Sequence, residues 1–513
     1  MYQINLIKRI IMTENITSQS AVNIESTKVN GTEEKFQWTK QWYPVAIAEC
    51  LDPSRPQAIE LLGKNFVLWR DKQGKWICFE DLCPHRLVRL SEGRVESDGT
   101  LLCAYHAWRF NTEGKCVSMP QSKDEETEAR NCASSRSCVT VYPLQERQGL
   151  LWLWPESGSQ ALIESKLKEP RVIPELEESP ERVVNKSAWN FRDLPYGWDY
   201  FIENIADPAH VPVSHHNIMG SRYKDANYFD MVSVRKLSTQ EGFSFETKPT
   251  PPDIETLIND FQPPCLMRVY SVDKSGCKYI LTLYGVPIRP GWTRLIGNQI
   301  FVKNEKGEVP KKGLGFFALP MPIWLTHILS SMLLHQDSVF LHYQEKFMAQ
   351  SPQEKWLAKV YTPNPSDKMV ITFRQWWEKR AGGEIPWDKN CNQQLPPPEQ
   401  DKRKLFDVWN THTKDCYSCQ KALKNINRLS LAAYLVSIVC LSWGIIADVR
   451  YIAFKAIQLS VSREMFSSVL SWVPPQSFWL AVIGAALFAL TGYLLKKLTR
   501  LFYVYEFEHF HND

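Results

Sequence analysis

The pattern of hydrophobic and polar positions changes twice along the chain and divides it into three regions. Up to about residue 160, short apolar runs alternate with Gly and Asp turns such as Lys72-Gln73-Gly74 and Asp98-Gly99, which is typical of a small all-β domain. Between about 185 and 380, strand-like runs lead to one long helical segment, Pro322–Met348, which predicts an α+β domain. The third region contains two long uncharged stretches.

Composition places the boundaries between these regions. The strand-like runs of the first region are Gln41–Val45, Phe66–Arg70, Trp76–Phe79, Leu101–Ala104, Ala107–Phe110 and Leu150–Trp154. Those of the second are Phe229–Val234, Phe243–Glu246, Met267–Ser271, Lys278–Val286 and Thr293–Phe301. A Pro- and Glu-rich stretch, about 155–182, is predicted to link the two domains, and the polar stretch 120–138 is predicted to leave the β core. We therefore expect a disordered tail (1–37), a β domain (38–160), a second domain (185–380), a connector (381–428), a helical hairpin (429–495) and a C-terminal tail (496–513).

The two uncharged stretches are Leu429–Ala447 and, after Pro474-Pro475, Gln476–Leu495. Nineteen residues of helix span about 28 Å, so each stretch is long enough to cross a bilayer. A buried pair of core helices is the alternative. Basic residues flank both ends of the hairpin, which places these flanks and the preceding domains on the cytoplasmic side: Lys421, Lys424, Arg428, Lys496, Lys497 and Arg500. The loop between the stretches is also basic, so the charge contrast across the hairpin is small.

Composition also narrows the classes of function. A net charge of +4 over 513 residues, without a basic stretch interleaved with aromatics, argues against nucleic-acid binding. The 19 Trp and 24 Phe suit a large apolar pocket or a membrane interface. Thirteen scattered cysteines indicate a reducing compartment. The N-terminal tail holds one arginine, Arg9, against four glutamates, unlike a transit peptide, which favours a bacterial, cyanobacterial-type chain over an imported plastid precursor.

Two Cys/His pairs in the first region carry candidate metal chemistry. Cys83 and His85 form C-x-H, and Cys103 and His106 form C-x2-H after seventeen intervening residues. Two cysteines on one iron and two histidines on the other make a Rieske [2Fe–2S] cluster, in which the replacement of thiolates by imidazoles raises the reduction potential. A structural zinc site is the alternative, but zinc sites more usually pair like ligands. We therefore predict these four residues as cluster ligands.

A second constellation opens the second region. Asn204, Asp207, His210 and His215 form N-x2-D-x2-H-x4-H. Five residues advance a helix by about 500°, so two imidazoles on one helix would point roughly 140° apart. Pro212 is predicted to break the helix and let His215 swing back, with Asp207 one helical turn from His210 on the same face. Two imidazoles and a carboxylate from elsewhere form the facial triad that leaves positions open on a ferrous ion for O2 and substrate.

The Cys/His pairs followed by N-x2-D-x2-H-x4-H resemble the Rieske non-haem iron oxygenases. Within that superfamily, DLPYGWDYFIENIADPAHVPVSHH (193–216) resembles the pheophorbide a oxygenase group, which includes the lethal-leaf-spot type proteins and the protochlorophyllide-associated and 55-kDa translocon components. This group shares a C-terminal CxxC and a hydrophobic tail, and the chain has Cys416 and Cys419 before its uncharged stretches. The resemblance extends from about Trp38 to the end of the chain.

This resemblance supplies the third iron ligand. The segment from His335 to Glu345 is similar to the one that carries it, and Asp337 is the matching residue, with Glu345 as the fallback. An Asp in an otherwise apolar helix is costly to bury unless it is paired or bound to a metal. His335 and His342 are expected to be packing or surface residues and not ligands. The resemblance also implies the helix-grip fold, with an antiparallel sheet, for the second domain.

The resemblance also implies how the two metals communicate. In the superfamily, the Asp of N-x2-D bridges a cluster histidine of one subunit to an iron histidine of the next subunit. Asp207 matches this residue, and Asn204 would support the iron ligands from the second sphere. Asp207 and Asn204 are therefore the candidate catalytic residues beside the metals, and the bridge implies a homotrimer.

Cys416 and Cys419 lie just before the first uncharged stretch. A C-x-x-C is a redox pair, half of a metal site or two inert thiols. A structural zinc site here would need His412 and one further ligand. The resemblance favours a redox or regulatory pair.

Together these features predict a membrane-anchored α+β oxygenase. It would take electrons from a ferredoxin-type donor through the [2Fe–2S] cluster to a mononuclear Fe(II) and use O2 to oxygenate an apolar substrate. A chlorophyll-related tetrapyrrole such as pheophorbide a fits a membrane anchor, as would a sterol or terpenoid, and the resemblance favours monooxygenation. A redox-sensing membrane component that uses the cluster and the CxxC without turnover is the alternative of another class, although it would need no iron triad. The expected location is a cyanobacterial thylakoid or plasma membrane, with the catalytic domains on the cytoplasmic side.

Overall fold

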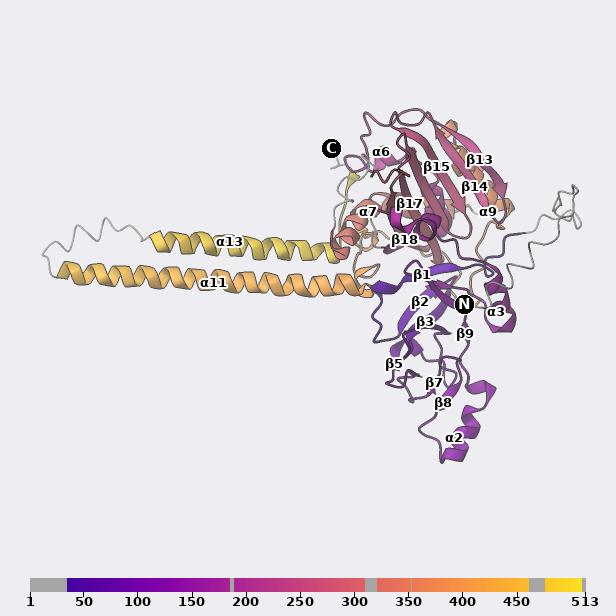
Figure 1. The fold of residues 1–513 in the computed structure, drawn as a ribbon, viewed down its shortest axis with the longest axis horizontal. Helices are drawn as coiled ribbons and strands as arrows, with labels where there is room; N and C mark the ends of the chain where they lie inside the picture. The colour runs from indigo at the N-terminus through magenta and orange to yellow at the C-terminus, as the bar shows by residue number, and fades with distance from the viewer. Residues whose placement is uncertain (1–34, 185–188, 310–320, 352, 461–475, 510–513) are drawn as a thin grey trace, which may run out of the picture. The chain divides into compact units, whose positions relative to one another are not determined.

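The computed structural model describes residues 35–184, 189–309, 321–351, 353–460 and 476–509. Most of the predicted N-terminal tail, the Pro474-Pro475 turn and the end of the predicted C-terminal tail lie outside the described residues. The chain from Lys35 onward contains two β-rich domains and a pair of long helices (Figure 1).

The N-terminal domain is built on short strands, as the alternation of short apolar runs predicts, and its described residues form three small sheets. Their strand orders are β1-β11-β10, β2-β3-β4-β9 and β5-β6-β7-β8, and every pairing is antiparallel. The strands are β1 (Tyr43–Ile47), β2 (Gln57–Leu61), β3 (Lys64–Arg70), β4 (Trp76–Glu80), β5 (Arg94–Val95), β6 (Leu101–Leu102), β7 (Arg109–Phe110), β8 (Cys116–Ser118), β9 (Val141–Tyr142), β10 (Leu144–Arg147) and β11 (Leu150–Leu153). The polar stretch leaves these sheets as predicted and forms α2 (Glu125–Cys132).

The predicted linker is partly helical. It contains α3 (Gly158–Leu167) and α4 (Pro174–Glu178). An ion pair of 2.9 Å between Lys40 and Glu164 holds α3 against the N-terminal domain. Composition alone does not predict α4, because proline usually indicates a linker. Pro174 lies in the first turn of α4, where the N–H that proline lacks would have no partner within the helix.

The second domain contains a seven-stranded antiparallel sheet in the order β12-β18-β17-β16-β15-β14-β13. Its strands are β12 (Asn190–Leu194), β13 (Asp230–Ser238), β14 (Gly242–Lys248), β15 (Ile254–Gln262), β16 (Leu266–Asp273), β17 (Lys278–Arg289) and β18 (Trp292–Val302). Helix α5 (Trp198–Ile205) packs against β17 and β18, α9 (Lys368–Lys379) against β13 and β14, and α7 (Ile323–Met348) against β12. The predicted long helix is confirmed as α7, and the α+β class with an antiparallel sheet is confirmed.

The sequence pattern does not predict strands β12 and β15. Strand β12 is missed because it contains two adjacent charged residues, Arg192 and Asp193, which do not fit an apolar strand pattern. Asp193 forms a bidentate ion pair, at 2.7 and 2.9 Å, with its cross-strand partner Arg294 on β18, and Arg192 is buried. The partner that neutralises Asp193 comes from another strand, which is a tertiary effect that the local pattern does not contain.

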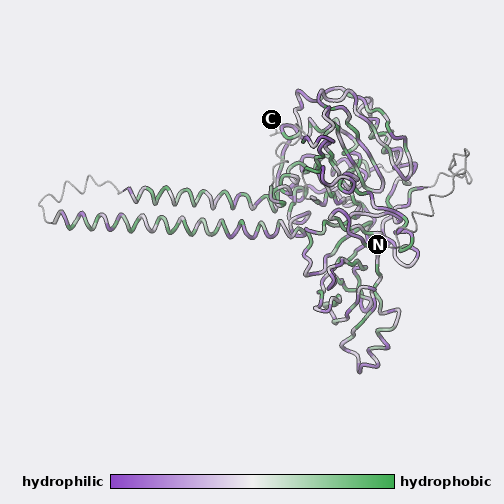
Figure 2. The backbone as a smooth tube through the Cα atoms, in the orientation of Figure 1, coloured by the Kyte–Doolittle hydropathy of each residue, from purple (hydrophilic) through white to green (hydrophobic). Residues whose placement is uncertain are grey.

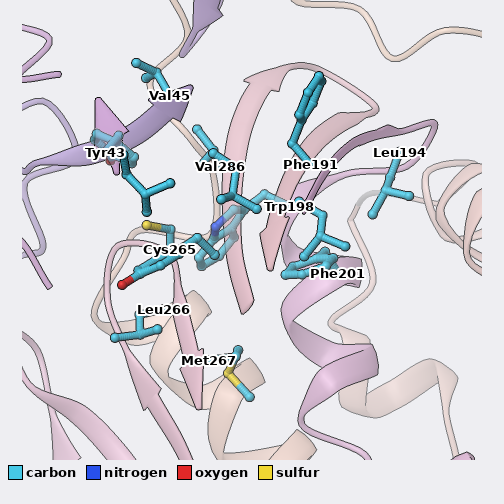
Figure 3. Close-up of a cluster of buried hydrophobic side chains, with 14 of the residues drawn as sticks. Tyr43, Val45, Phe191, Leu194, Trp198, Phe201, Cys265, Leu266, Met267 and Val286 are labelled. Atoms are coloured by element: carbon cyan, nitrogen blue, oxygen red, sulfur yellow. The ribbon is translucent and has the colours of Figure 1, made fainter. Parts of the chain in front are cut away.

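The two domains share one core. Tyr43 and Val45 of β1 belong to the same cluster of buried side chains as Phe191 and Val286 of the second domain (Figure 3). Across this junction the guanidinium of Arg294 donates a hydrogen bond to Val45 O at 3.1 Å. The two domains are therefore held together by a shared hydrophobic core as well as by the linker.

Two long helices follow the connector, α11 (Tyr417–Ser460) and α13 (Gln476–Thr499), and they lie side by side (Figure 1). Hydrophobic residues dominate both (Figure 2), and both are long and apolar enough to cross a membrane. Ser430 and Ser437 of α11 donate to the carbonyls of Gly492 and Ala485 of α13, each at 2.8 Å, and such small residues let helices approach closely in lipid.

Helix α11 is longer than the predicted span Leu429–Ala447 and begins already at Tyr417. Its first turns pack on the two domains, where Leu423 and Ile426 are buried. The predicted boundary between connector and hairpin therefore lies inside one continuous helix. After α13 and the short helix η8 (Arg500–Phe502), the chain returns to the connector, where Val408 N donates to Tyr503 O at 2.8 Å.

Candidate metal centres and active site

The two Cys/His pairs of the N-terminal domain lie on two loops of matching geometry, one after β4 and one after β6. In the first loop Cys83 N donates to Val88 O at 2.8 Å, and Leu87 N donates to Cys83 O at 2.9 Å. The second loop repeats both bonds at the same offsets from Cys103, at 2.8 and 3.0 Å. The fourth residue after each cysteine, Leu87 or Ala107, has a φ of 57°, a left-handed backbone conformation that residues other than glycine rarely adopt. Strain of this kind concentrates at functional sites.

The donor atoms of these loops are arranged as a two-iron cluster requires. The thiols of Cys83 and Cys103 are buried, whereas His85 and His106 are partly exposed, with ring centroids 4.5 Å apart. A hydrogen bond from Cys83 lowers the pKa of the Cys103 thiol to about 6. His85 Nδ1 is buried and has no hydrogen-bond partner among the described residues, as expected of an atom that binds a metal. The four residues fit a cluster with cysteines on the inner iron and histidines on the outer iron.

The second constellation folds differently from the prediction. Helix α5 ends at Ile205, so Asp207 does not lie on a helix with His210. Pro208 explains the early end, because a residue before proline avoids the helical conformation and proline lacks the N–H. Pro212 does not break a helix but lies in the first turn of a new one, α6 (Val211–Ser214).

His210 and His215 flank the short helix α6 as its N-cap and C-cap residues. Its single turn brings their imidazoles together, with ring centroids 5.5 Å apart. The outcome predicted for the two histidines is therefore reached by another route, which is a helix between them and not a break between them.

Asp337 completes this group from α7. Its Oδ2 lies 3.2 Å from His215 Nε2 and 3.6 Å from His210 Nε2. The three donor atoms lie within 4.8 Å of one another. We call His210, His215 and Asp337 the triad. Two imidazoles and one carboxylate on one face fit a ferrous ion with open positions.

Two residues that sequence reasoning missed hold the triad in place. Gln336 Oε1 accepts a hydrogen bond from His215 Nδ1 at 2.8 Å, and the Ser214 hydroxyl donates to Asp337 Oδ1. Burial acts to raise the pKa of Asp337, but the two neighbouring imidazoles and the hydrogen bond from the Ser214 hydroxyl hold it below its usual value. Asp337 is thus ready to bind a cation. Ser214 and Gln336 each stand next to a ligand in the sequence, which is the only signal that could have found them.

Asp207 and Asn204 lie beside His210. The carbonyl of Asp207 contacts His210 Nδ1, its carboxylate Oδ2 lies 3.7 Å from the same atom, and Asn204 Nδ2 lies 3.5 Å from His210 Nε2. The Asp207 side chain is one third exposed, so it can also reach a group outside the chain. Burial acts to lower the pKa of His210, but Asp207 and Asp337 together raise it above its ordinary value.

Helix α5 owes its position to close packing and buried charge pairs. A Cβ on Gly285 of β17 would lie 2.3 Å from the ring of Phe201, so only glycine admits α5 this close to the sheet. On the other side, Arg374 of α9 forms ion pairs with Asp199, at 2.6 Å, and with Glu203. These contacts fix the helix that leads into Asn204.

The remaining candidates on α7 lie away from the triad. Glu345 pairs with Lys346 at 2.8 Å, and burial raises its pKa to about 7. His335 Nδ1 contacts Tyr505 O at 2.7 Å, and His342 bridges Pro195 O, at 2.6 Å, and Glu399 N, at 2.9 Å. Both histidines make structural hydrogen bonds, as expected. The structure therefore brings Asp337, and not Glu345, to His210 and His215.

His210 and Asp337 of the triad line a cavity of about 610 Å³. This volume lies within the range of small-molecule sites, about 300–1,000 Å³. Much of the wall is apolar and comprises Val213, Phe340, Leu341, Trp356, Val360 and Val370. Asn204 and Asp207 line it on the side of His210, and His509, beyond the second long helix, closes another side. The cavity can hold an apolar molecule next to the triad.

Cys416 and Cys419 are buried free thiols at the start of α11. His412 Nε2 lies 3.3 Å from Cys419 Sγ, and the thiol also lies 3.5 Å from His327 Nδ1. His327 is a residue that the sequence does not single out, because 92 positions separate it from Cys419.

A β-domain with paired Cys/His loops, followed by a sheet domain with a His/His/Asp group in an apolar cavity, defines a Rieske non-haem iron oxygenase. Two family models match: one for the Rieske [2Fe-2S] domain at residues 41–143 and one for pheophorbide a oxygenase at residues 261–355. The chain belongs to the pheophorbide a oxygenase group of these oxidoreductases, whose cofactors are a [2Fe–2S] cluster and a mononuclear iron.

Individual relatives agree with this family. The chloroplastic pheophorbide a oxygenase of Oryza sativa subsp. japonica is 31% identical over 462 residues, covering 85% of this chain and 83% of that protein. The chloroplastic flavonoid 8-hydroxylase 2 of Ocimum basilicum is 30% identical over 470 residues, covering 87% and 85%. The crystal structure of dicamba monooxygenase bound to dicamba shares the fold, with a TM-score of 0.52 and 18% identity over 68% of this chain and 98% of that one.

Proposed function

We propose that this protein oxygenates an apolar, chlorophyll-related tetrapyrrole at an iron held by His210, His215 and Asp337. The observation that carries the proposal is the position of the triad at an apolar cavity of about 610 Å³. An electron carrier or redox sensor needs no such cavity beside its metal. The intact triad therefore favours turnover over a purely sensory role.

Cys83, His85, Cys103 and His106 would hold the [2Fe–2S] cluster. When bound, the cluster supplies single electrons from a ferredoxin-type donor, and the ferrous ion activates O2. The chain's own groups perform the remaining tasks. Gln336 orients His215, Ser214 orients Asp337, and Phe340 and Leu341 offer an apolar wall to the substrate.

A second copy of the chain is the proposed partner at the cluster loops. His85 and His106 are partly exposed there, and around them Leu87 and Tyr105 expose 68% and 59% of their surface. Exposed apolar side chains beside a redox centre suit a protein interface. Asp207, one third exposed beside His210, is the group that would meet a cluster histidine of the neighbouring subunit. This pairing supports a homotrimer.

The membrane is the proposed source of the substrate. The two long helices would anchor the chain with its catalytic domains on the cytoplasmic side. The segment that follows the second helix returns to the catalytic domain, and its His509 packs against Phe340 in the cavity wall, with the ring centroids 4.2 Å apart and the ring planes tilted by 35°. We propose that a lipid-soluble substrate enters the cavity past this wall.

The experiment is turnover with reduced ferredoxin and O2 over a panel of chlorophyll-related tetrapyrroles, a flavone, a sterol and a terpenoid, with products identified by mass spectrometry. We expect one oxygen atom to be incorporated into a tetrapyrrole. The flavone is included because a relative is named as a flavonoid hydroxylase. Turnover of the flavone alone would contradict the proposed substrate, and no O2 consumption with any member would contradict the enzymatic proposal. His210→Ala, which removes one triad imidazole, is the matched inactive control.

A further inference from the structure

Four buried side chains with metal-binding atoms meet at the base of the long helices, away from both centres described above. His327 lies on α7, His412 precedes the short helix η7 (Thr413–Asp415), and Cys416 and Cys419 lie at the start of α11. One donor atom from each residue lies within 4.8 Å of all the others. Each side chain is at most 2% exposed.

Four of the six distances between these donor atoms are close to those of a tetrahedral site. His412 Nε2 lies 3.1 Å from His327 Nδ1 and 3.3 Å from Cys419 Sγ. His327 Nδ1 lies 3.5 Å from Cys419 Sγ and 3.6 Å from Cys416 Sγ. A zinc ion with two nitrogen and two sulfur ligands at ordinary bond lengths sets its ligand atoms about 3.3–3.8 Å apart. These four distances are therefore close to the edge lengths of that tetrahedron, and the other two are no longer than 4.8 Å.

The protonation of the two imidazoles points to the same conclusion. His412 Nδ1 faces Phe191 O at 2.7 Å, and His327 Nε2 faces Trp189 O at 3.0 Å. A carbonyl only accepts, so both of these nitrogens carry their protons. The inward nitrogens of both neutral rings are then bare lone pairs, aimed at each other across 3.1 Å. A metal ion between them removes this repulsion, and a histidine that binds a metal commonly donates its other N–H to a carbonyl in this way.

We propose that His327, His412, Cys416 and Cys419 bind one structural zinc ion. Two thiolates and two imidazoles in a buried site with no open position are the donor set of structural zinc, and not of a catalytic metal. The site goes beyond the proposed oxygenase function, because none of its residues lines the cavity of the triad.

The zinc ion would connect the start of α11 to α7, the helix that carries Asp337. Cys416 and Cys419 come from the start of α11, whereas His327 comes from α7, which also carries Asp337 about 15 Å further along the helix. The buried thiol of Cys50, from the N-terminal domain, lies beside Cys416. Zinc would thus join elements that lie far apart in the sequence, much as a disulfide does in an oxidising compartment.

The test is metal analysis of the full chain, purified without an affinity tag in detergent and washed with a chelator. We expect about one zinc per chain beside about three irons, which are the two of the cluster and the mononuclear iron. Cys419→Ser and His412→Ala should lose at least nine tenths of the zinc and keep the Rieske electron paramagnetic resonance signal. Cys265→Ala, which changes another buried cysteine, and Cys50→Ser should keep the zinc.

X-ray absorption at the zinc edge of the unmutated chain gives a readout that does not depend on any variant folding. Two sulfur and two nitrogen neighbours at about 2.3 and 2.0–2.1 Å are expected. A shell of oxygen and nitrogen only would mean adventitious surface zinc and would overturn the proposal. So would a zinc-free chain with a Cys416–Cys419 disulfide, which would favour the redox pair, or zinc that persists in Cys419→Ser.

Discussion

The imidazole of His215 donates from Nδ1 to the amide oxygen of Gln336, at 2.8 Å. This bond leaves His215 Nε2 as the nitrogen that faces Asp337, at 3.2 Å. Gln336 and Asp337 are neighbours on α7, so one helix both orients the imidazole and supplies the carboxylate beside it. Such outer partners keep a ligating histidine in one tautomer, and their removal typically costs 10–100-fold in metal affinity.

We therefore expect Gln336→Leu to weaken binding of Fe(II) at the mononuclear site by about 10–100-fold while leaving the cluster unchanged. An Fe(II) titration of the iron-depleted protein, followed by turnover, measures the affinity. Ser338→Ala is the matched control, because Ser338 is a buried neighbour on the same helix whose hydroxyl donates to Leu334 O within that helix. Equal iron affinity in the two variants would show that Gln336 does not orient the ligand.

The identity of the carboxylate in the triad is tested by two variants of one helix. Asp337→Ala should lose the mononuclear iron and all product, since two imidazoles without a carboxylate bind Fe(II) weakly. Glu345→Gln should keep both, because Glu345 pairs with Lys346 outside the triad. Iron content and product yield are the measurements, with the cluster spectrum as a check on folding. Iron loss in Glu345→Gln alone would exchange the roles of the two acids.

How far the sequence predicts this fold depends on how local each signal is. Helix α7 is foreseen almost to the residue, because its 26 positions hold no strong helix breaker. Strand β12 is not foreseen, since the ion pair that neutralises Asp193 comes from Arg294 on β18. The site follows the same rule. The cluster loops and the His210/His215 pair are short motifs that can be recognised in the sequence. The roles of Ser214 and His327 cannot be recognised there, because they depend on partners more than 80 residues away.

The local structure of the His210/His215 motif shows a further limit. Spacing alone predicts one helix broken at Pro212, but the chain ends α5 at Ile205 and uses Pro212 to begin α6. Both proline roles are physically sound, because proline is excluded from a helix interior and favoured in its first turn. Only the position of the preceding Pro208 decides between them. The prediction that the two imidazoles come together is therefore right, although the predicted local structure between them is wrong.

Asp207→Asn should separate communication between the metals from their assembly. The change keeps the shape and the carbonyl contact to His210 but removes the charge that is proposed to meet the neighbouring subunit. We expect both metals to stay bound and turnover to fall by at least 100-fold, with the single-turnover rate of electron transfer as the measurement. Asp225→Asn, on the exposed loop that follows, should behave like the unmutated chain. Normal turnover in Asp207→Asn would contradict the bridge.

The two long helices, which are the proposed membrane anchor, can be removed without disturbing the residues at their base. Asn427 and Lys496, on the two long helices, are joined by a hydrogen bond of 3.3 Å, so a short Gly/Ser linker can connect Arg428 to Lys496 in place of 429–495. This variant keeps the returning segment around Tyr503. We expect it to partition into the soluble fraction with both metal centres assembled. Retention on membranes would mean that another surface binds lipid.

Glu345 gives the protein a dependence on pH whose sign follows from its burial. The carboxyl is 8% exposed, and burial, only partly offset by Lys346, raises its pKa from 4.5 to about 7. Between these values the folded state binds the proton more tightly than the unfolded state. The contribution of Glu345 to the free energy of unfolding is therefore greatest below about pH 4.5 and is lost as the pH rises to about 7.

The size of this effect is bounded by the pKa difference. At about 1.4 kcal/mol per pKa unit, the loss reaches about 3 kcal/mol. Glu345→Gln does not titrate, so the melting temperature of the unmutated chain relative to this variant should fall between pH 5 and 7.5. Other titrating groups cancel in the difference, because they are common to both proteins. The same comparison with Glu354→Gln, an exposed neighbour, should stay flat. A difference that stays constant for Glu345→Gln as well would mean that Glu345 is ionised throughout, held by Lys346 more firmly than its burial opposes.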